Sequence, residues 1–346
     1  MILILKNQYH KAITLWIILM IILVVSMIIV GGFTRLTDSG LSITKWELFK
    51  GIIPPLNESG WQSYFNIYKQ TDQYKFLFPN MNLQEFKYIF FWEYIHRLLG
   101  RVFGLAFIIP FIYFIYKRIF SKFLLFQLTI IFLLILLQGA IGWFMVSSGL
   151  NNAVTVSHYR LSLHLFMAFV ILSSLVWVYL NIKSKLLKNF FSDFLHFTSY
   201  KIFFILLLLQ IIIGAWVSGL DAGRIYQTWP SYNGNLLPSD INFQNLNYID
   251  FKNNSYVQFL HRNLGYIIFL LSIYVGYKIF FIFKKKNWYI PYISVLFLIF
   301  TQIVLGILTL VSNLNIYIAL MHQSSSILLT LFALNLYYII QKQPSK

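Results

Sequence analysis

Four histidines occupy comparable points in two similar stretches of the sequence. His96 and His164 fall in the first stretch, and His261 and His322 in the second. Neutral imidazole binds iron without bringing charge into an apolar environment, and histidine is a common axial ligand of haem. Two histidines per stretch therefore favour bis-imidazole ligation of haem over a plain metal site, for which no cluster of three ligands is visible. For any one of them alone, the alternative is a hydrogen-bonded histidine at a membrane interface.

One acidic residue distinguishes the two stretches. Glu93 stands three residues before His96, a spacing that places both side chains on one face of a helix. The neutral Gln258 holds the same position before His261. A carboxylate in a partly apolar site tends to have a raised pKa and can transfer protons. The difference predicts that the first site does chemistry and the second holds a cofactor. The alternative is a glutamate stabilised by a helix N-terminus.

An arginine follows the first histidine of each pair. Arg97 and Arg262 are predicted to contact the propionates of haem, because arginine pairs well with carboxylates. The alternative is an interfacial arginine that reaches the lipid headgroups. His10 and His196 lie in basic stretches and are interpreted as ordinary surface residues.

The segments that must position these residues are those of an all-α integral membrane protein. The chain is 59% hydrophobic and only 11% charged, and it has no cysteine. A lack of cysteine excludes disulfides, thiolate metal sites and iron–sulfur clusters. Eight apolar runs are long enough to span a bilayer as helices: 13–31, 93–116, 121–146, 161–181, 200–219, 257–283, 289–311 and 317–340.

The charges predict an orientation. The N-terminus, the C-terminal tail and the connections 117–122, 183–201 and 278–286 together hold 15 of the 27 Lys and Arg and one of the ten acids. The positive-inside rule makes this face cytoplasmic, with both termini on it. The net charge of +17 is then explained by topology and anionic lipid, and no nucleic acid is required. We expect a multi-pass protein of the cell inner membrane with its histidines toward the periplasmic side.

The two stretches form an internal repeat. Gly31–Gly40 aligns with Gly214–Gly223, and the spacing from His96 to Gln138 matches that from His261 to Gln302 to within one residue. Both stretches run in the same direction across the membrane, which predicts two parallel-repeat four-helix bundles. The N-terminal half spans 13–181 and includes a long outer segment, 32–92. The C-terminal half spans 200–340 and includes an outer segment, 220–256.

The ordered motifs resemble those of the haem A synthase family, in its cysteine-free alphaproteobacterial and mitochondrial branch. They are Glu93–Arg97, Gly31–Gly40, the Tyr159–Leu161 run before His164, His261-Arg262 and Met321-His322-Gln323. The resemblance covers about 13–340. His158 stands where relatives more often have proline, and no role is assigned to it.

This resemblance implies an oxidoreductase that converts the C8 methyl group of haem O to a formyl group, giving haem A for cytochrome oxidase assembly, with oxygen from water. It implies haem b as the cofactor on His261 and His322, the haem substrate at His96 and His164, and Glu93 as the catalytic residue. A haem O synthase and cytochrome oxidase assembly factors would be natural partners. Two alternatives stay open: a quinone-linked dihaem electron-transfer protein, and a haem transporter or chaperone.

Overall fold

Eight long helices make up most of the molecule. The structure is a computed structural model that describes residues 7–44, 50–150, 153–190, 197–241 and 249–341. The long helices are α1 (Asn7–Leu36), α4 (Leu83–Tyr116), α5 (Lys122–Gly149), α6 (His158–Ser184), α7 (Thr198–Gly219), α8 (Asn254–Tyr277), α9 (Lys286–Val311) and α10 (Ile316–Ile340). All eight are long and apolar enough to cross a membrane. The prediction of an all-α membrane protein is confirmed, and the chain is a multi-pass membrane protein.

Helix α4 begins ten residues before the apolar run that predicted it. Asn82 caps the helix, accepting from the backbone amides of Gln84 and Glu85, while the Glu85 carboxylate accepts from the Asn82 amide. This capping box satisfies backbone donors that would otherwise lack partners. The first turns of α4 are amphipathic rather than continuously apolar, so a search for apolar runs overlooks them.

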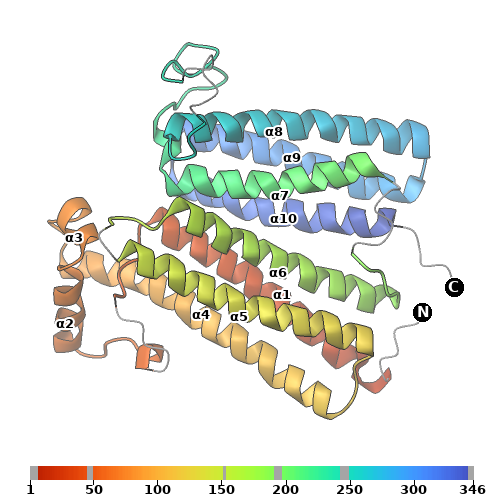
Figure 1. Ribbon diagram of the computed structural model, residues 1–346, viewed down its shortest axis with the longest axis horizontal. Coiled ribbons are helices and arrows are strands. Elements are labelled where there is room, and N and C mark those ends of the chain that lie inside the picture. The colour runs from red at the N-terminus through yellow and green to blue at the C-terminus, as the bar shows by residue number, and fades with distance from the viewer. Residues whose placement is uncertain (1–6, 45–49, 151–152, 191–196, 242–248, 342–346) are drawn as a thin grey trace.

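The helices pack as four close pairs (Figure 1). Helix α1 packs on α4 and α5 on α6, and in the same way α7 packs on α8 and α9 on α10. Few contacts join α4 to α5 or α8 to α9. The two halves meet through α6 against α7 and α1 against α10. The pairing of α1 with α4 and of α5 with α6 thus has counterparts in the second half, whereas α1 packs on α6 much more closely than α7 packs on α10.

Short elements gather at one end of the bundle, here named the cap end. They are η1 (Lys50–Ile52), α2 (Glu58–Tyr68) and α3 (Asp72–Leu77) in the first half, and η2 (Ala222–Arg224) in the second (Figure 1). Helix α2 packs on the start of α4 through an aromatic cluster that includes Phe65, Tyr68 and Phe86. The long outer segment 32–92 thus contains helices of its own.

The opposite end of the bundle, here named the terminal end, is where α1 begins and α10 ends (Figure 1). A π-helical turn, η4 (Lys278–Phe283), extends α8 there. The large apolar core, with Phe107, Leu172 and Ala333 among its fully buried members, occupies the part of the bundle from mid-helix to this end. All four paired histidines lie on the cap-end side of this core.

Candidate functional site

Each of the four paired histidines packs against a glycine of a neighbouring helix. A Cβ atom added to any of these glycines would lie between 2.9 and 3.1 Å from the imidazole Cε1 atom, which is closer than ordinary contact. The pairs are His96 on α4 with Gly31 on α1, His164 on α6 with Gly142 on α5, His261 on α8 with Gly214 on α7, and His322 on α10 with Gly306 on α9. We name these four glycines the glycine cradles. They allow each ring to lie directly on a helix backbone.

Within each half, the two imidazole rings face one another at the distance that a shared metal requires. The ring centroids of His96 and His164 are 6.3 Å apart, and those of His261 and His322 are 6.4 Å apart. An imidazole nitrogen binds a metal at about 2.0 Å, and roughly 1.1 Å more separates it from the ring centre, so two ligands across one metal have centroids about 6.2 Å apart. Both pairs fit axial ligation of a single haem iron.

The environment of the ring nitrogens supports the same interpretation. The Nδ1 atom of each of the four rings is buried and has no hydrogen-bond partner among the described residues. A buried polar atom without a partner needs an explanation. Because Nδ1 is enclosed by protein, Nε2 is the atom that remains to bind iron in His96, His261 and His322, whereas Nε2 of His164 also lies 3.4 Å from the Gln138 side-chain amide. Among the described residues there is no cluster of three or more potential metal ligands.

Three glutamines hold the backbone of the histidine helices. Gln138 donates to the carbonyl oxygen of His164 at 3.0 Å, Gln210 to that of His261 at 2.9 Å, and Gln302 to that of His322 at 3.0 Å. Each glutamine stands four residues before a glycine cradle. The fourth cradle, Gly31, has Met27 at that position instead.

Glu93 is buried where α4 meets the chain that follows α1. Only 3% of the residue is exposed. Its Oε2 atom accepts from the Ser42 hydroxyl at 2.7 Å and from the Ile43 amide at 2.9 Å, and its Oε1 atom accepts from Arg97 at 2.5 Å. The described residues include no hydrogen bond between Glu93 and His96, so the three-residue spacing does not bring these two side chains into contact. In all three contacts an oxygen of the Glu93 side chain is the hydrogen-bond acceptor.

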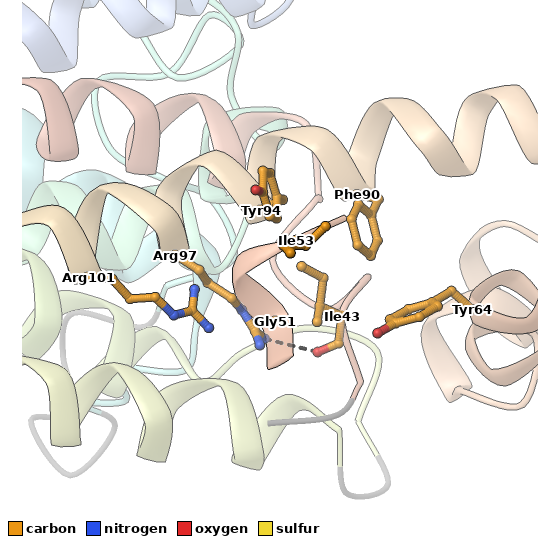
Figure 2. Close-up of a pocket in the computed structure, with 8 residues that line it drawn as sticks. All are labelled: Ile43, Gly51, Ile53, Tyr64, Phe90, Tyr94, Arg97 and Arg101. Carbon is orange, nitrogen blue, oxygen red and sulfur yellow. Dashed lines mark hydrogen bonds between the residues drawn. The ribbon is translucent and has the colours of Figure 1, made fainter. Parts of the chain in front are cut away.

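Arg97 therefore has protein partners on its own side of the site. Its Nη2 atom donates both to Glu93 and to the Ile43 carbonyl oxygen at 2.9 Å. Figure 2 shows the hydrogen bond from Arg97 to the Ile43 carbonyl oxygen at the edge of a small pocket. Arg101 lies one turn further along α4, and Tyr64 lies on the opposite side. The predicted contact between Arg97 and a haem propionate stays a prediction.

The matching position in the second half has the opposite hydrogen-bond polarity. Gln258, buried to the same degree as Glu93, donates from Nε2 to the Tyr226 carbonyl oxygen at 2.9 Å. Arg262 donates to the Pro230 carbonyl oxygen at 2.8 Å and lies over the Tyr232 ring at 4.0 Å. Its Nε and Nη1 atoms are buried without a hydrogen-bond partner among the described residues. Arg262 thus has N–H groups suited to an anionic partner.

The remaining histidines lie apart from the two pairs. His158 begins α6, and its backbone packs against Gly219 at the end of α7. The Nε2 atom of His10 lies 3.3 Å from the Ile182 carbonyl oxygen, at the terminal end. His196 lies outside the described residues.

Sequence reasoning missed two parts of this site. No contact with a histidine was predicted for any of the four glycine cradles, although a glycine four residues after a glutamine is a pattern that three of them share. Ser42 was not singled out, and no local pattern marks it as a partner of Glu93.

Comparison with known proteins places the chain among relatives over nearly its whole length. The profile of the cytochrome oxidase assembly protein family COX15-CtaA matches residues 14–334. A protein named "Heme A synthase" from Pelagibacter ubique (strain HTCC1062) is 43% identical over 344 residues, which cover 97% of each chain.

Two further relatives carry the same name. The protein from Maricaulis maris (strain MCS10) is 40% identical over 334 residues, covering 94% of each chain. The protein from Wolbachia sp. subsp. Brugia malayi (strain TRS) is 39% identical over 328 residues, covering 94% of this chain and 95% of the relative.

Proposed function

This chain belongs to the COX15-CtaA family of cytochrome oxidase assembly proteins, and from that premise we propose that it is a haem A synthase. It oxidises the C8 methyl group of haem O to a formyl group, producing haem A for cytochrome oxidase assembly. The observation that carries the proposal is the pair of facing histidines in each half, at 6.3 and 6.4 Å. An enzyme that holds one haem and transforms another needs two such sites.

The second-half pair is the one we assign to a resident haem b. His261 and His322 would ligate its iron through Nε2, and the buried N–H groups of Arg262 would receive a propionate. When bound, haem b would supply a one-electron redox centre that takes up the electrons released at the substrate site. Because the matching position is the neutral Gln258, this half offers no carboxylate there for proton transfer. The Gln258 amide donates to the Tyr226 carbonyl oxygen instead.

The first-half pair is the one we assign to the substrate. His96 and His164 would orient haem O, and Glu93 would accept protons released as the methyl group is oxidised with oxygen from water. Ser42 and Arg97 hold the two oxygens of Glu93 in fixed positions, which limits the orientations the carboxylate can take. Arg97 acts here through Glu93 as a positioning residue.

The same proposal includes the setting of the enzyme. The charge distribution supports the cell inner membrane, both termini in the cytoplasm and the cap end toward the periplasm. A haem O synthase would deliver the substrate, and cytochrome oxidase assembly factors would take the product.

A dihaem electron-transfer protein is the second candidate, because both histidine pairs have nearly the same geometry. Such a protein would use its two haems equally and would leave their substituents unchanged.

One experiment separates these functions. The chain is expressed in cells that make haem O, and the extracted haems are separated by chromatography. We expect haem A from the natural sequence and about 100-fold less from Glu93→Gln, the order expected when a general base is removed. Glu85→Gln, a change in the same helix that keeps a capping residue at this position, is the matched control and should retain full conversion. Haem O that stays unconverted in well-expressed, haem-loaded protein would refute the synthase proposal.

The assignment of the two pairs is tested on the same samples. His261→Ala and His322→Ala should lower the haem b retained by purified protein, whereas His96→Ala and His164→Ala should spare it. Equal haem b loss from all four variants would contradict the division between the halves.

A further inference from the structure

A single arginine at the cap end connects the two halves. Arg35, in the last turn of α1, donates to the Asp38 carboxylate at 2.7 Å within its own half. It also donates to the Ser218 carbonyl oxygen at 2.6 Å and to the Asp221 carboxylate at 3.1 Å, both in the second half. Its side chain is 14% exposed, whereas the side chains of Asp38 and Asp221 are 36% and 52% exposed, so the guanidinium is mostly buried while the Asp221 carboxylate is open to solvent. We name the three residues Arg35, Asp38 and Asp221 the inter-half joint.

Both aspartates of the joint hold a backbone conformation that favours glycine. Asp38 has φ of 50° and Asp221 has φ of 51°, and the two are matching positions of the aligned segments. Left-handed backbone is costly for residues other than glycine, although aspartate tolerates it better than most. Here both carboxylates converge on one guanidinium.

The joint is asymmetric although the aspartates are equivalent. The position that matches Arg35 in the second half is Ser218, which contributes only its carbonyl oxygen. A single guanidinium therefore serves both halves, and it comes from the half that carries Glu93. Removing Asp221 would take away a second-half contact from a first-half residue.

The chain between the joint and Glu93 is short and buried. Ser39, Leu41 and Ser42 are each at most 2% exposed. We name residues 38–43 the strap. At its far end, Ser42 and Ile43 supply two of the three hydrogen bonds to the Glu93 carboxylate. The position of Asp38 therefore limits where those two donors can lie.

The cap holds the strap from the other side. The Gln73 amide of α3 donates to the Asp38 carbonyl oxygen at 3.0 Å, and the Tyr68 hydroxyl of α2 donates to Gln73 at 3.0 Å. Leu41 lies against Gly149 at the end of α5. The strap is thus fixed by the cap, by α5 and, through Arg35, by the second half.

We propose that Arg35 and Asp221 are positioning residues for Glu93, so that the second half, beyond binding a cofactor, sets the hydrogen-bond donors of the first-half carboxylate. The inference rests on the proposed role of Glu93. The alternative is a clamp, meaning that the joint only holds the two halves together. Loss of a clamp would affect the strap no more than other segments.

The test uses haem-loaded protein in lipid nanodiscs and the variant Asp221→Gly, which removes the carboxylate and keeps the left-handed backbone accessible. We expect amide hydrogen exchange in peptides covering 38–44 to rise about threefold or more, while peptides of α8 and α10 stay unchanged. The rate kcat for haem O conversion should fall about tenfold with KM within about twofold, as expected for a displaced catalytic group. Haem b content should equal that of the natural protein.

The matched control is Asn233→Gly, which changes another left-handed residue of the same outer segment, with φ of 51°. It should leave both readouts unchanged. Asp221→Asn, which restores an oxygen acceptor, should recover most of the exchange protection. If Asp221→Gly does not accumulate, Arg35→Met and Asp221→Asn decide the question by the same measurements.

Unchanged exchange at 38–44 would overturn the proposal. So would faster exchange spread evenly over both halves, since that result describes a clamp. An active Glu93→Gln variant would refute the role of Glu93 while leaving the exchange measurement as an independent test of the joint.

Discussion

The two halves differ most sharply at one hydrogen bond. In the first half, the backbone amide of Ile43 donates to Glu93; in the second, the backbone carbonyl of Tyr226 accepts from Gln258. Ile43 and Tyr226 are matching positions, each five residues after its left-handed aspartate. The backbone group that faces the side chain three residues before the first histidine thus differs between the halves. The two halves therefore differ both in the side chain, Glu93 or Gln258, and in the orientation of the loop backbone at Ile43 or Tyr226.

The largest expected effect comes from exchanging these two side chains. In the double variant Glu93→Gln with Gln258→Glu, the new carboxylate would face the Tyr226 carbonyl oxygen, an acceptor against an acceptor. We expect haem A production to fall by about 100-fold or more and haem b retention to fall as well. Chromatography of extracted haems measures both. Production that survives the exchange would mean that the halves are interchangeable.

The glycine cradles give the next largest effect and divide the halves cleanly. Alanine at any cradle places a methyl group about 3 Å from an imidazole carbon, so the ring must shift. Gly214→Ala and Gly306→Ala should reduce haem b in purified protein by about fivefold or more, an affinity loss typical of a disturbed ligand. Gly31→Ala and Gly142→Ala should keep haem b and lose haem O conversion. Haem b loss from the first-half variants would break the comparison.

A smaller effect is expected from the glutamines behind the histidines. Gln210→Leu and Gln302→Leu each remove a donor to a ligand-bearing backbone and should cost about 1 kcal/mol of stability. Gln138→Leu is their counterpart in the first half. The haem b Soret band is used to monitor thermal unfolding. Gln210→Leu and Gln302→Leu should lose this band at a lower temperature than the natural protein, whereas Gln138→Leu should leave its transition nearly unchanged. Equal shifts from all three would indicate general loosening of the bundle.

The smallest effect concerns the joint between the halves. Burial is the largest cause that raises the pKa of Asp38 above its ordinary 3.8. Arg35 opposes this shift, whereas the negative charge of Asp221 adds to it. The folded state then binds this proton more tightly than the unfolded state, so Asp38's contribution to stability falls as pH rises from 3.8 through the raised value. Asp38→Asn has no such dependence. The thermal midpoint of the natural protein should therefore decline relative to the variant across that window, and parallel curves would contradict the assignment.

Apolar runs were enough to predict all eight membrane helices, because a bilayer requires long uninterrupted stretches. The start of α4 was not predicted, because its first turns lie against α2 and the cap. An amphipathic pattern is enough to stabilise a helix in that position. The four paired histidines were found from their repeated spacing. Their division into cofactor and substrate sites remains a prediction.

The contacts around Glu93 could be predicted only in part. Arg97 stands four residues after Glu93, a spacing that itself favours an ion pair, and that signal competed with the expected propionate. Only the tertiary fold brings Ser42 to Glu93 and Asp221 to Arg35. The pair Arg35 and Asp221 is separated by 186 positions, and no local pattern connects residues so far apart.

The packing of α10 against α1 has a consequence for how the protein is made. Helix α10 carries His322 and is synthesised after the other seven long helices described here, yet it packs on α1, which is synthesised before them. His96 and His164 are both synthesised before any helix of the second half, whereas the second pair is complete only once α10 has been made. Domains generally fold in the order of their synthesis. The pocket that we assign to haem b should therefore form after the first-half site, so that cofactor capture would mark a chain in which all eight long helices are present.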